Sequence, residues 1–182
     1  MKKIIILLYF FVLCSTNVVA NETGIKLNKL FNDLLISNNK TSSEIEQKIW
    51  KLWSTHPMDK ELTLMLAKGS DAFNNNQFNE AIDIFTNVIN LDPNWAEAWN
   101  KRATVLYMIG EYQKSQNDIN KVLELENRHF GALAGQGLVN IKLKNYEKAI
   151  KSYKKALKIY PSMRSPEIMI KQIEALIKQD LI

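Results

Sequence analysis

The sequence predicts an all-α protein: a right-handed α-α superhelix of about three stacked helix pairs, preceded by a helical hairpin and followed by a capping helix. The first observation is a repeat, because small residues recur every 34 positions at Gly69, Ala103 and Gly137. The second is the helical spacing of apolar residues within each repeat. The third is the composition, 46% hydrophobic with 6 Gly and 4 Pro in 182 residues, which is enough for one domain with a substantial core.

Residues 1–20 have the pattern of a secretory signal peptide. Lys2 and Lys3 precede an apolar run over 4–14, and small residues then lead to Ala20. We expect cleavage after Ala20, which would lower the formal charge from +5 to +3 and remove the single cysteine. The alternative is an uncleaved anchor, although the run is shorter than the ~20 residues that cross a bilayer comfortably.

Residues 21–60 are expected to form an N-terminal helical hairpin, either a degenerate repeat or a cap at the front of the repeats. The second helix follows a possible capping box over 41–44. Trp50 and Trp53 favour buried packing, with a partner-binding face as the alternative. The apolar positions are Leu27, Leu30, Phe31, Leu34 and Leu35 in the first helix, and Ile45, Ile49, Leu52 and Trp53 in the second.

Residues 61–163 are expected to hold three helix pairs, over 62–95, 96–129 and 130–163. In each pair, a small residue in the first helix leaves room for the second helix, and an aromatic residue fills the space where the two helices diverge. Turn residues separate the two helices of each pair. The recurring positions are Gly69, Ala103 and Gly137; Phe78, Tyr112 and Tyr146; and Ala81, Ser115 and Ala149.

Over residues 62–163, the sequence resembles the tetratricopeptide repeat family. The resemblance is carried by these positions and by Trp99, Tyr107, Gly110, Phe85, Tyr153, Ala156, Pro93 and Pro161. Departures are Met65 and Leu133 in place of tryptophan, Ser115 for alanine and Asn127 for proline. The mature chain also looks similar to small exported repeat proteins of alphaproteobacteria. The resemblance implies that the first helices line a concave face that binds a peptide or a partner helix, and it favours a bacterial periplasmic location.

Residues 164–182 are expected to form a helix that covers the last repeat. Ser165 is a candidate N-cap with Pro166 at the first helical position. An apolar stripe follows at Ile168, Met169, Ile173, Leu176 and Ile177.

The predicted binding residues face the concave side, opposite the packing notch of each first helix. Asn100 could instead bridge groups within its own helix pair. One subgroup of the family grips C-terminal carboxylates with a five-residue clamp; here only Asn100 matches, because Leu66, Ser70, Gly131 and Gly135 occupy the other four places. The candidate binding residues are Ser70, Asn100, Thr104, Tyr107, Met108 and Leu138.

The sequence lacks the residue motifs that usually indicate a catalytic site. The two histidines, His56 and His129, stand near expected helix ends, where imidazole caps a carbonyl or faces water. No metal-binding, phosphate-binding or nucleophile motif occurs, so no enzyme activity, cofactor or metal is expected. The lysine-rich stretch 142–158 is interrupted by Glu147 and by apolar residues, which indicates a solvated helix face and no nucleic-acid partner.

Together these features predict a periplasmic protein-interaction module, a scaffold or assembly factor that binds a protein or peptide in its concave groove. One alternative is a membrane-anchored adaptor of an envelope complex, which retains its signal. Another is an enzyme with an unrecognised site, for which loss of an activity on mutation of His56 or His129 would be needed. The partner's identity and the oligomeric state are left open.

Overall fold

The structure is a computed structural model that describes residues 22–179, and all regular elements in this range are helices. No helix in that range is long and apolar enough to span a bilayer. The predicted signal peptide lies outside the described residues. The helices cover residues 22–36, α2 (Asn39–Trp53), α3 (Lys60–Asn74), α4 (Phe78–Leu91), α5 (Ala96–Met108), α6 (Tyr112–Leu125), α7 (Phe130–Lys142), α8 (Tyr146–Ile159) and α9 (Arg164–Gln179).

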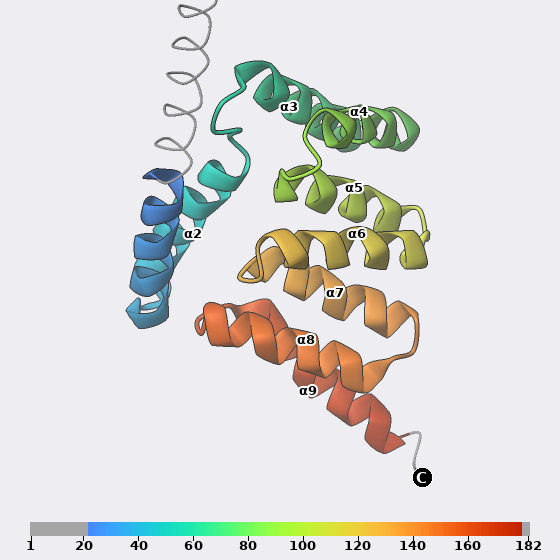
Figure 1. Cartoon of the computed structure of the whole chain (residues 1–182). Helices are drawn as coiled ribbons and strands as arrows, with labels where there is room; N and C mark the ends of the chain where they lie inside the picture. The colour runs from blue at the N-terminus through green and yellow to red at the C-terminus, as the bar shows by residue number, and fades with distance from the viewer. Residues whose placement is uncertain (1–21, 180–182) are drawn as a thin grey trace, which may run out of the picture.

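Helices α3 to α9 stack as successive antiparallel neighbours into a solenoid (Figure 1), so the predicted all-helical superhelix is confirmed. The pairs α3/α4, α5/α6 and α7/α8 close with the same turn. Asn76, Gly110 and Lys144, again 34 residues apart, all have positive φ, at 60°, 84° and 57°. The amide after each of them donates to a carbonyl five residues earlier, as in a Schellman motif. Only the middle turn uses glycine, so the repeat tolerates the cost of a side chain at this position.

In two of the three pairs, the small residue of the first helix makes room for one particular side chain of the second helix. A Cβ placed on Gly69 would lie 2.5 Å from Cε1 of Phe85, and one on Gly137 would collide with the ring of Tyr153. The glycines therefore make room for an aromatic ring of the second helix. In the middle pair, Ser115 donates its hydroxyl to the carbonyl of Ala103 at 2.8 Å.

The stability of this packing should depend on pH in the alkaline range, because Tyr153 is a buried phenol. Burial, and secondarily the nearby Tyr107, raises the pKa of Tyr153 to about 12. Its hydroxyl is buried and has no hydrogen-bond partner among residues 22–179. Because the folded pKa exceeds the unfolded value near 10, this contribution to stability is present below pH ~10 and is lost as pH rises toward 12.

We therefore expect the melting temperature of the protein to fall more between pH 10 and 12 than that of Tyr153→Phe, with little difference between the two at pH 7. Thermal denaturation followed by circular dichroism measures both. Parallel pH profiles for the two proteins would show that Tyr153 ionises equally well in the folded chain.

Two helix starts differ from their predicted positions. Helix α2 begins at Asn39, because the side chain of Asn38 accepts hydrogen bonds from the amides of Lys40 and Thr41 at 3.1 Å. The predicted capping box over 41–44 therefore lies inside the helix. Helix α9 begins at Arg164, which places Ser165 within the first turn and not at the N-cap. Ile170 and Ile173 of α9 pack with Ala149 and Tyr153.

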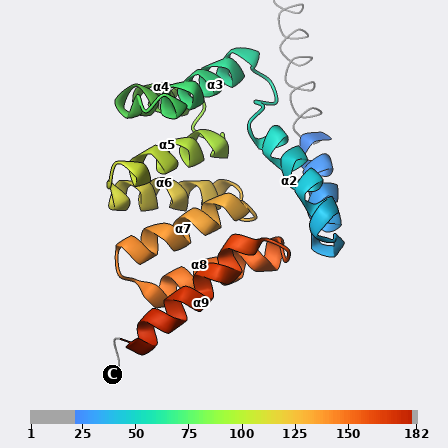
Figure 2. The ribbon, with the colours of Figure 1, turned by 180° about the vertical axis from the view of Figure 1, so that it is seen from behind.

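The N-terminal hairpin, the helix over residues 22–36 with α2, lies beside the stack, across the ends of its helices (Figures 1 and 2). This position differs from the expected cap at the front. The indole Nε1 of Trp95, just before α5, donates to the carbonyl of Trp53 at 2.8 Å. Nε2 of His56, which follows α2, lies 2.8 Å from Oδ2 of Asp92. Asp92 and Trp95 both belong to the turn between α4 and α5.

The hairpin also contacts the next two inter-repeat turns. Arg128, before α7, donates to Asn28 at 2.7 Å and lies over the ring of Phe31. Tyr160, after α8, donates its hydroxyl to Glu46 at 3.0 Å. The hairpin therefore runs along the edge of the solenoid where successive repeats connect. The contacts that hold it there join residues that are distant in sequence.

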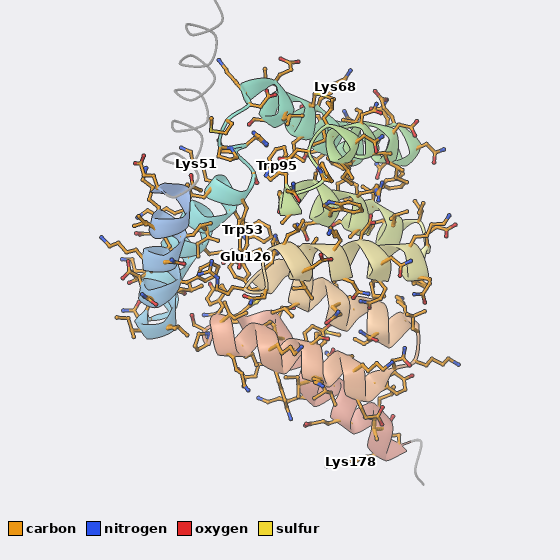
Figure 3. All side chains as sticks on the ribbon, viewed as in Figure 1. Lys51, Trp53, Lys68, Trp95, Glu126 and Lys178 are labelled. Atoms are coloured by element: carbon orange, nitrogen blue, oxygen red, sulfur yellow. The ribbon has the colours of Figure 1, made fainter. Side chains whose placement is uncertain are left out.

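The predicted burial is confirmed for Trp53, whereas Trp50 is half-buried. Trp53 is 6% exposed and stacks on the ring of His129, with centroids 3.9 Å apart and planes 8° apart. Trp50 meets the edge of Phe130 with centroids 5.5 Å apart. A Cβ on Gly131 would lie 2.5 Å from Cη2 of Trp50, so the absence of a side chain there allows the indole to seat. Figure 3 shows Trp53 and Trp95 between α2 and the stack.

Candidate functional site

Four of the six predicted binding residues line one small pocket between α5 and α7. Asn100, Thr104 and Tyr107 come from successive turns of α5, and Leu138 comes from α7. The pocket has a volume of about 80 Å³. The remaining lining residues are Ala103, Ser115, Ile119, Gly131, Ala132, Gly135 and Val139.

The other two predicted residues lie outside this lining. Ser70 is half-buried on α3, where its hydroxyl donates to the carbonyl of Leu66 at 3.0 Å. Met108 is 56% exposed at the end of α5, one residue after Tyr107. The structure therefore gathers Asn100, Thr104, Tyr107 and Leu138 and leaves Ser70 apart from them.

Asn100 fits both interpretations that the sequence left open. Its amide donates to Oε2 of Glu97 at 3.1 Å, within its own helix, and it also lines the pocket. Thr104 donates its hydroxyl to the carbonyl of Asn100 at 3.0 Å. The side-chain amide of Asn100 is thus oriented by a carboxylate before any ligand binds.

Sequence reasoning missed the buried pair that supports Asn100. His129 and Glu97 are both fully buried, and His129 Nε2 lies 3.1 Å from Oε2 of Glu97. Nδ1 of His129 accepts from the amide of Ala132 at 3.0 Å, so the ring proton resides on Nε2 and is donated to Glu97. Lys101 is the nearest cation, with Nζ 3.5 Å from Oε1 of Glu97.

The expectation that His129 caps a carbonyl or faces water was wrong. It is the N-cap of α7 and accepts an amide proton, and Trp53 shields its ring. His56 likewise accepts, from the amide of Asp59 at 2.8 Å, and its other ring nitrogen meets Asp92. The sequence offered one signal for the buried pair of His129 and Glu97, namely a histidine just before the first helix of a repeat. Its partner Glu97 stands 32 residues earlier with no local pattern to mark it.

The pocket contains no charged side chain in its lining. Of the five clamp places, Asn100, Gly131 and Gly135 line it, and Trp50 fills the space beside Gly131. An amide, a phenol and aliphatic surface can hydrogen-bond a peptide backbone and pack against its apolar side chains. Among residues 22–179, no group of three or more His, Cys, Asp or Glu is placed to hold a metal ion.

Tetratricopeptide repeat models match residues 66–115 and 131–163. A TPR repeat-containing protein of Rhizobium etli is 33% identical over 115 residues, covering 63% of this chain and 56% of the relative. RNA polymerase II-associated protein 3 of Xenopus tropicalis is 28% identical over 123 residues, covering 68% of this chain and 18% of the relative. This chain therefore matches about half or less of each relative's length. The Rhizobium protein agrees with the predicted similarity to alphaproteobacterial repeat proteins.

Solved structures show the same fold. The first TPR domain of Spaghetti, bound to an HSP90 peptide, has a TM-score of 0.64 and 21% identity, and covers 66% of this chain and 96% of that one. The crystal structure of MamA has a TM-score of 0.60 and 19% identity, and covers 76% of this chain and 84% of that one. The TPR2B domain of yeast Sti1, in a pHsp70 complex, has a TM-score of 0.61 and 17% identity, and covers 65% of this chain and 99% of that one.

Proposed function

Because this chain is a tetratricopeptide repeat protein, we propose that it binds a peptide or helix of a partner protein in the groove between α5 and α7. The proposed setting is the bacterial periplasm, where the protein would serve as a scaffold or assembly factor for envelope proteins. Equilibrium binding, without catalysis, is the proposed mechanism. The observation that carries the proposal is the convergence of Asn100, Thr104, Tyr107 and Leu138 on one pocket of the first helices.

The chemistry of the groove favours a neutral, partly apolar ligand. Leu138, in the pocket lining, is 37% exposed, and Met108, at the end of α5, is 56% exposed, so both present apolar side-chain surface to solvent. Two similar domains, from Spaghetti and from human RPAP3, are complexed with HSP90 and HSP70 peptides. The uncharged residues at four of the five clamp places argue against carboxylate-terminated peptides here, since charge-assisted bonds supply the affinity of such a clamp.

The periplasmic part of the proposal rests on the sequence of residues 1–20. N-terminal sequencing of the protein recovered from the producing bacterium tests it, with a chain that begins at Asn21 as the expected result. A chain that begins at Met1 would favour the membrane-anchored adaptor.

A charge placed in the groove should weaken partner capture without unfolding the protein. Leu138→Glu introduces a carboxylate into a pocket that holds no cation, and a bound apolar side chain would have to desolvate it. We expect the variant to lose at least about tenfold of the partner captured from envelope extract, because such a desolvation costs ~1–3 kcal/mol or more. Quantitative mass spectrometry of the captured proteins measures the loss.

Leu176→Glu is the matched control, because Leu176 is 40% exposed on α9 and lies outside the pocket. Circular dichroism should show equal helix content in both variants. Partners retained equally by both variants would place the binding site outside the groove.

A further inference from the structure

A larger and chemically different pocket opens on the other side of the last two repeats. It has a volume of about 380 Å³ and lies between α6, α7 and α8, and it shares no lining residue with the groove pocket. Its lining is almost entirely amides and lysines and contains no Asp or Glu. The lining residues are Gln113, Gln116, Asn120, Gln136, Asn140, Leu143, Asn145, Lys148, Lys151, Ser152 and Lys155.

The amides form a network that joins the three helices. Gln116 of α6 donates to Asn120 at 2.8 Å and accepts from Asn140 of α7 at 3.4 Å. Ser152 of α8, which is buried, donates to Gln136 of α7 at 2.8 Å. Each side-chain amide carries two N–H groups, so Gln116 keeps one N–H for a ligand while its position is held. The lining of the pocket thus holds side-chain amides in position through hydrogen bonds among themselves, and Gln116 presents an N–H for a ligand.

The lysines supply positive charge along one wall. Lys148, Lys151 and Lys155 occupy one side of α8 and are exposed, and none of them forms an ion pair with a carboxylate among residues 22–179. By contrast, Lys121 and Lys171, on α6 and α9, do pair with neighbouring glutamates. Three unpaired cations beside amide donors are complementary to carboxylates.

We propose that this pocket binds an acidic peptide segment, extended along α8, with carboxylate side chains at alternate positions. The helix rises about 10 Å from the first of the three lysines to the last. Alternate side chains of an extended chain lie about 7 Å apart, so two or three carboxylates match this length. A volume of about 380 Å³ also accommodates several side chains, whereas a single small anion would leave most of it unfilled. The site is separate from the proposed groove, and it would let the protein hold two segments at once.

The test is fluorescence anisotropy with the full chain and a labelled hexapeptide of alternating glutamate and alanine. Lys151→Gln/Lys155→Gln removes two charges from the pocket wall. Lys154→Gln/Lys158→Gln removes two charges from the same helix at the same spacing, outside the lining. We expect the first variant to bind at least about tenfold more weakly, from the loss of two charge-assisted contacts, and the second less than about twofold more weakly.

Three further measurements complete the experiment. A hexapeptide of alternating lysine and alanine should not bind. Inorganic phosphate should displace the acidic peptide no better than sodium chloride at equal ionic strength, whereas specific displacement by phosphate would overturn the peptide assignment in favour of a small-anion site. Equal weakening by both double variants, or no binding of the acidic peptide to the unmodified protein, would also overturn the proposal. These outcomes are independent of Leu138→Glu, which changes only the groove.

Discussion

Trp53→Ala is expected to lower the free energy of unfolding by about 3–5 kcal/mol, the range for removal of a buried large aromatic side chain. Trp53 is 6% exposed, stacks on His129 and lies 5.9 Å, centroid to centroid, from Phe31. Its ring therefore joins both helices of the N-terminal hairpin to the repeat stack. Removing the ring leaves a cavity at the junction and withdraws cover from the buried imidazole.

The loss should be concentrated in the hairpin. Urea denaturation measures the change in stability, and hydrogen exchange should show the amides of residues 22–53 becoming less protected than those of α7 and α8. Leu35→Ala is the control on the same hairpin, because Leu35 is 48% exposed. Unchanged protection of the hairpin in Trp53→Ala would mean that the polar contacts at Trp95, Arg128 and Tyr160 hold it without the ring.

His129→Leu is expected to cost about 3–5 kcal/mol of stability, because it leaves the carboxylate of Glu97 buried without the imidazole N–H that donates to it. Among residues 22–179, the other polar side-chain contacts of Glu97 are a hydrogen bond from Asn100 and the ammonium group of Lys101 at 3.5 Å. The new side chain also cannot accept the hydrogen bond that the Ala132 amide now donates to His129 at 3.0 Å. Urea denaturation at pH 7 measures the cost.

The double variant Glu97→Met/His129→Leu should recover a large part of that loss, because two apolar side chains of similar volume replace a buried polar pair. The recovery separates the cost of an orphaned carboxylate from the cost of lost aromatic packing, which both variants share. A double variant no more stable than His129→Leu would assign the whole effect to packing against Trp53 and to the lost cap of α7.

The groove shows how much of a binding surface follows from repeat register. Thr104 and Leu138 stand 34 residues apart at the same repeat position, and they line one pocket together with Asn100 and Tyr107 of α5 and with Ala103 and Ser115 of the middle packing notch. Ser70 stands at the same repeat position, but it bonds to Leu66 in its own helix and lies outside the pocket. Register predicts which way a side chain faces, whereas the volume left between neighbours depends on every side chain around it.

The starts of α2 and α9 differ from their predicted positions for a similar reason. Several residues near each start can cap a helix, and a pattern does not say which one has free amides within reach. Asn38 caps α2 because its side chain reaches two amides of the first turn, which a capping box three residues later would not satisfy.

The helices, their pairing and the solenoid could all be predicted from the sequence, because they follow from contacts between residues close in the chain and from a 34-residue period that repeats them. Three features depend instead on long-range packing: the position of the hairpin, the burial of His129 against Glu97, and the meeting of amides from three helices beside the lysines of α8. Distance along the chain explains the difference. Trp53 and His129 are neighbours only after the repeats between them have folded, and the free energy of such a contact depends on shape and desolvation that no local pattern records.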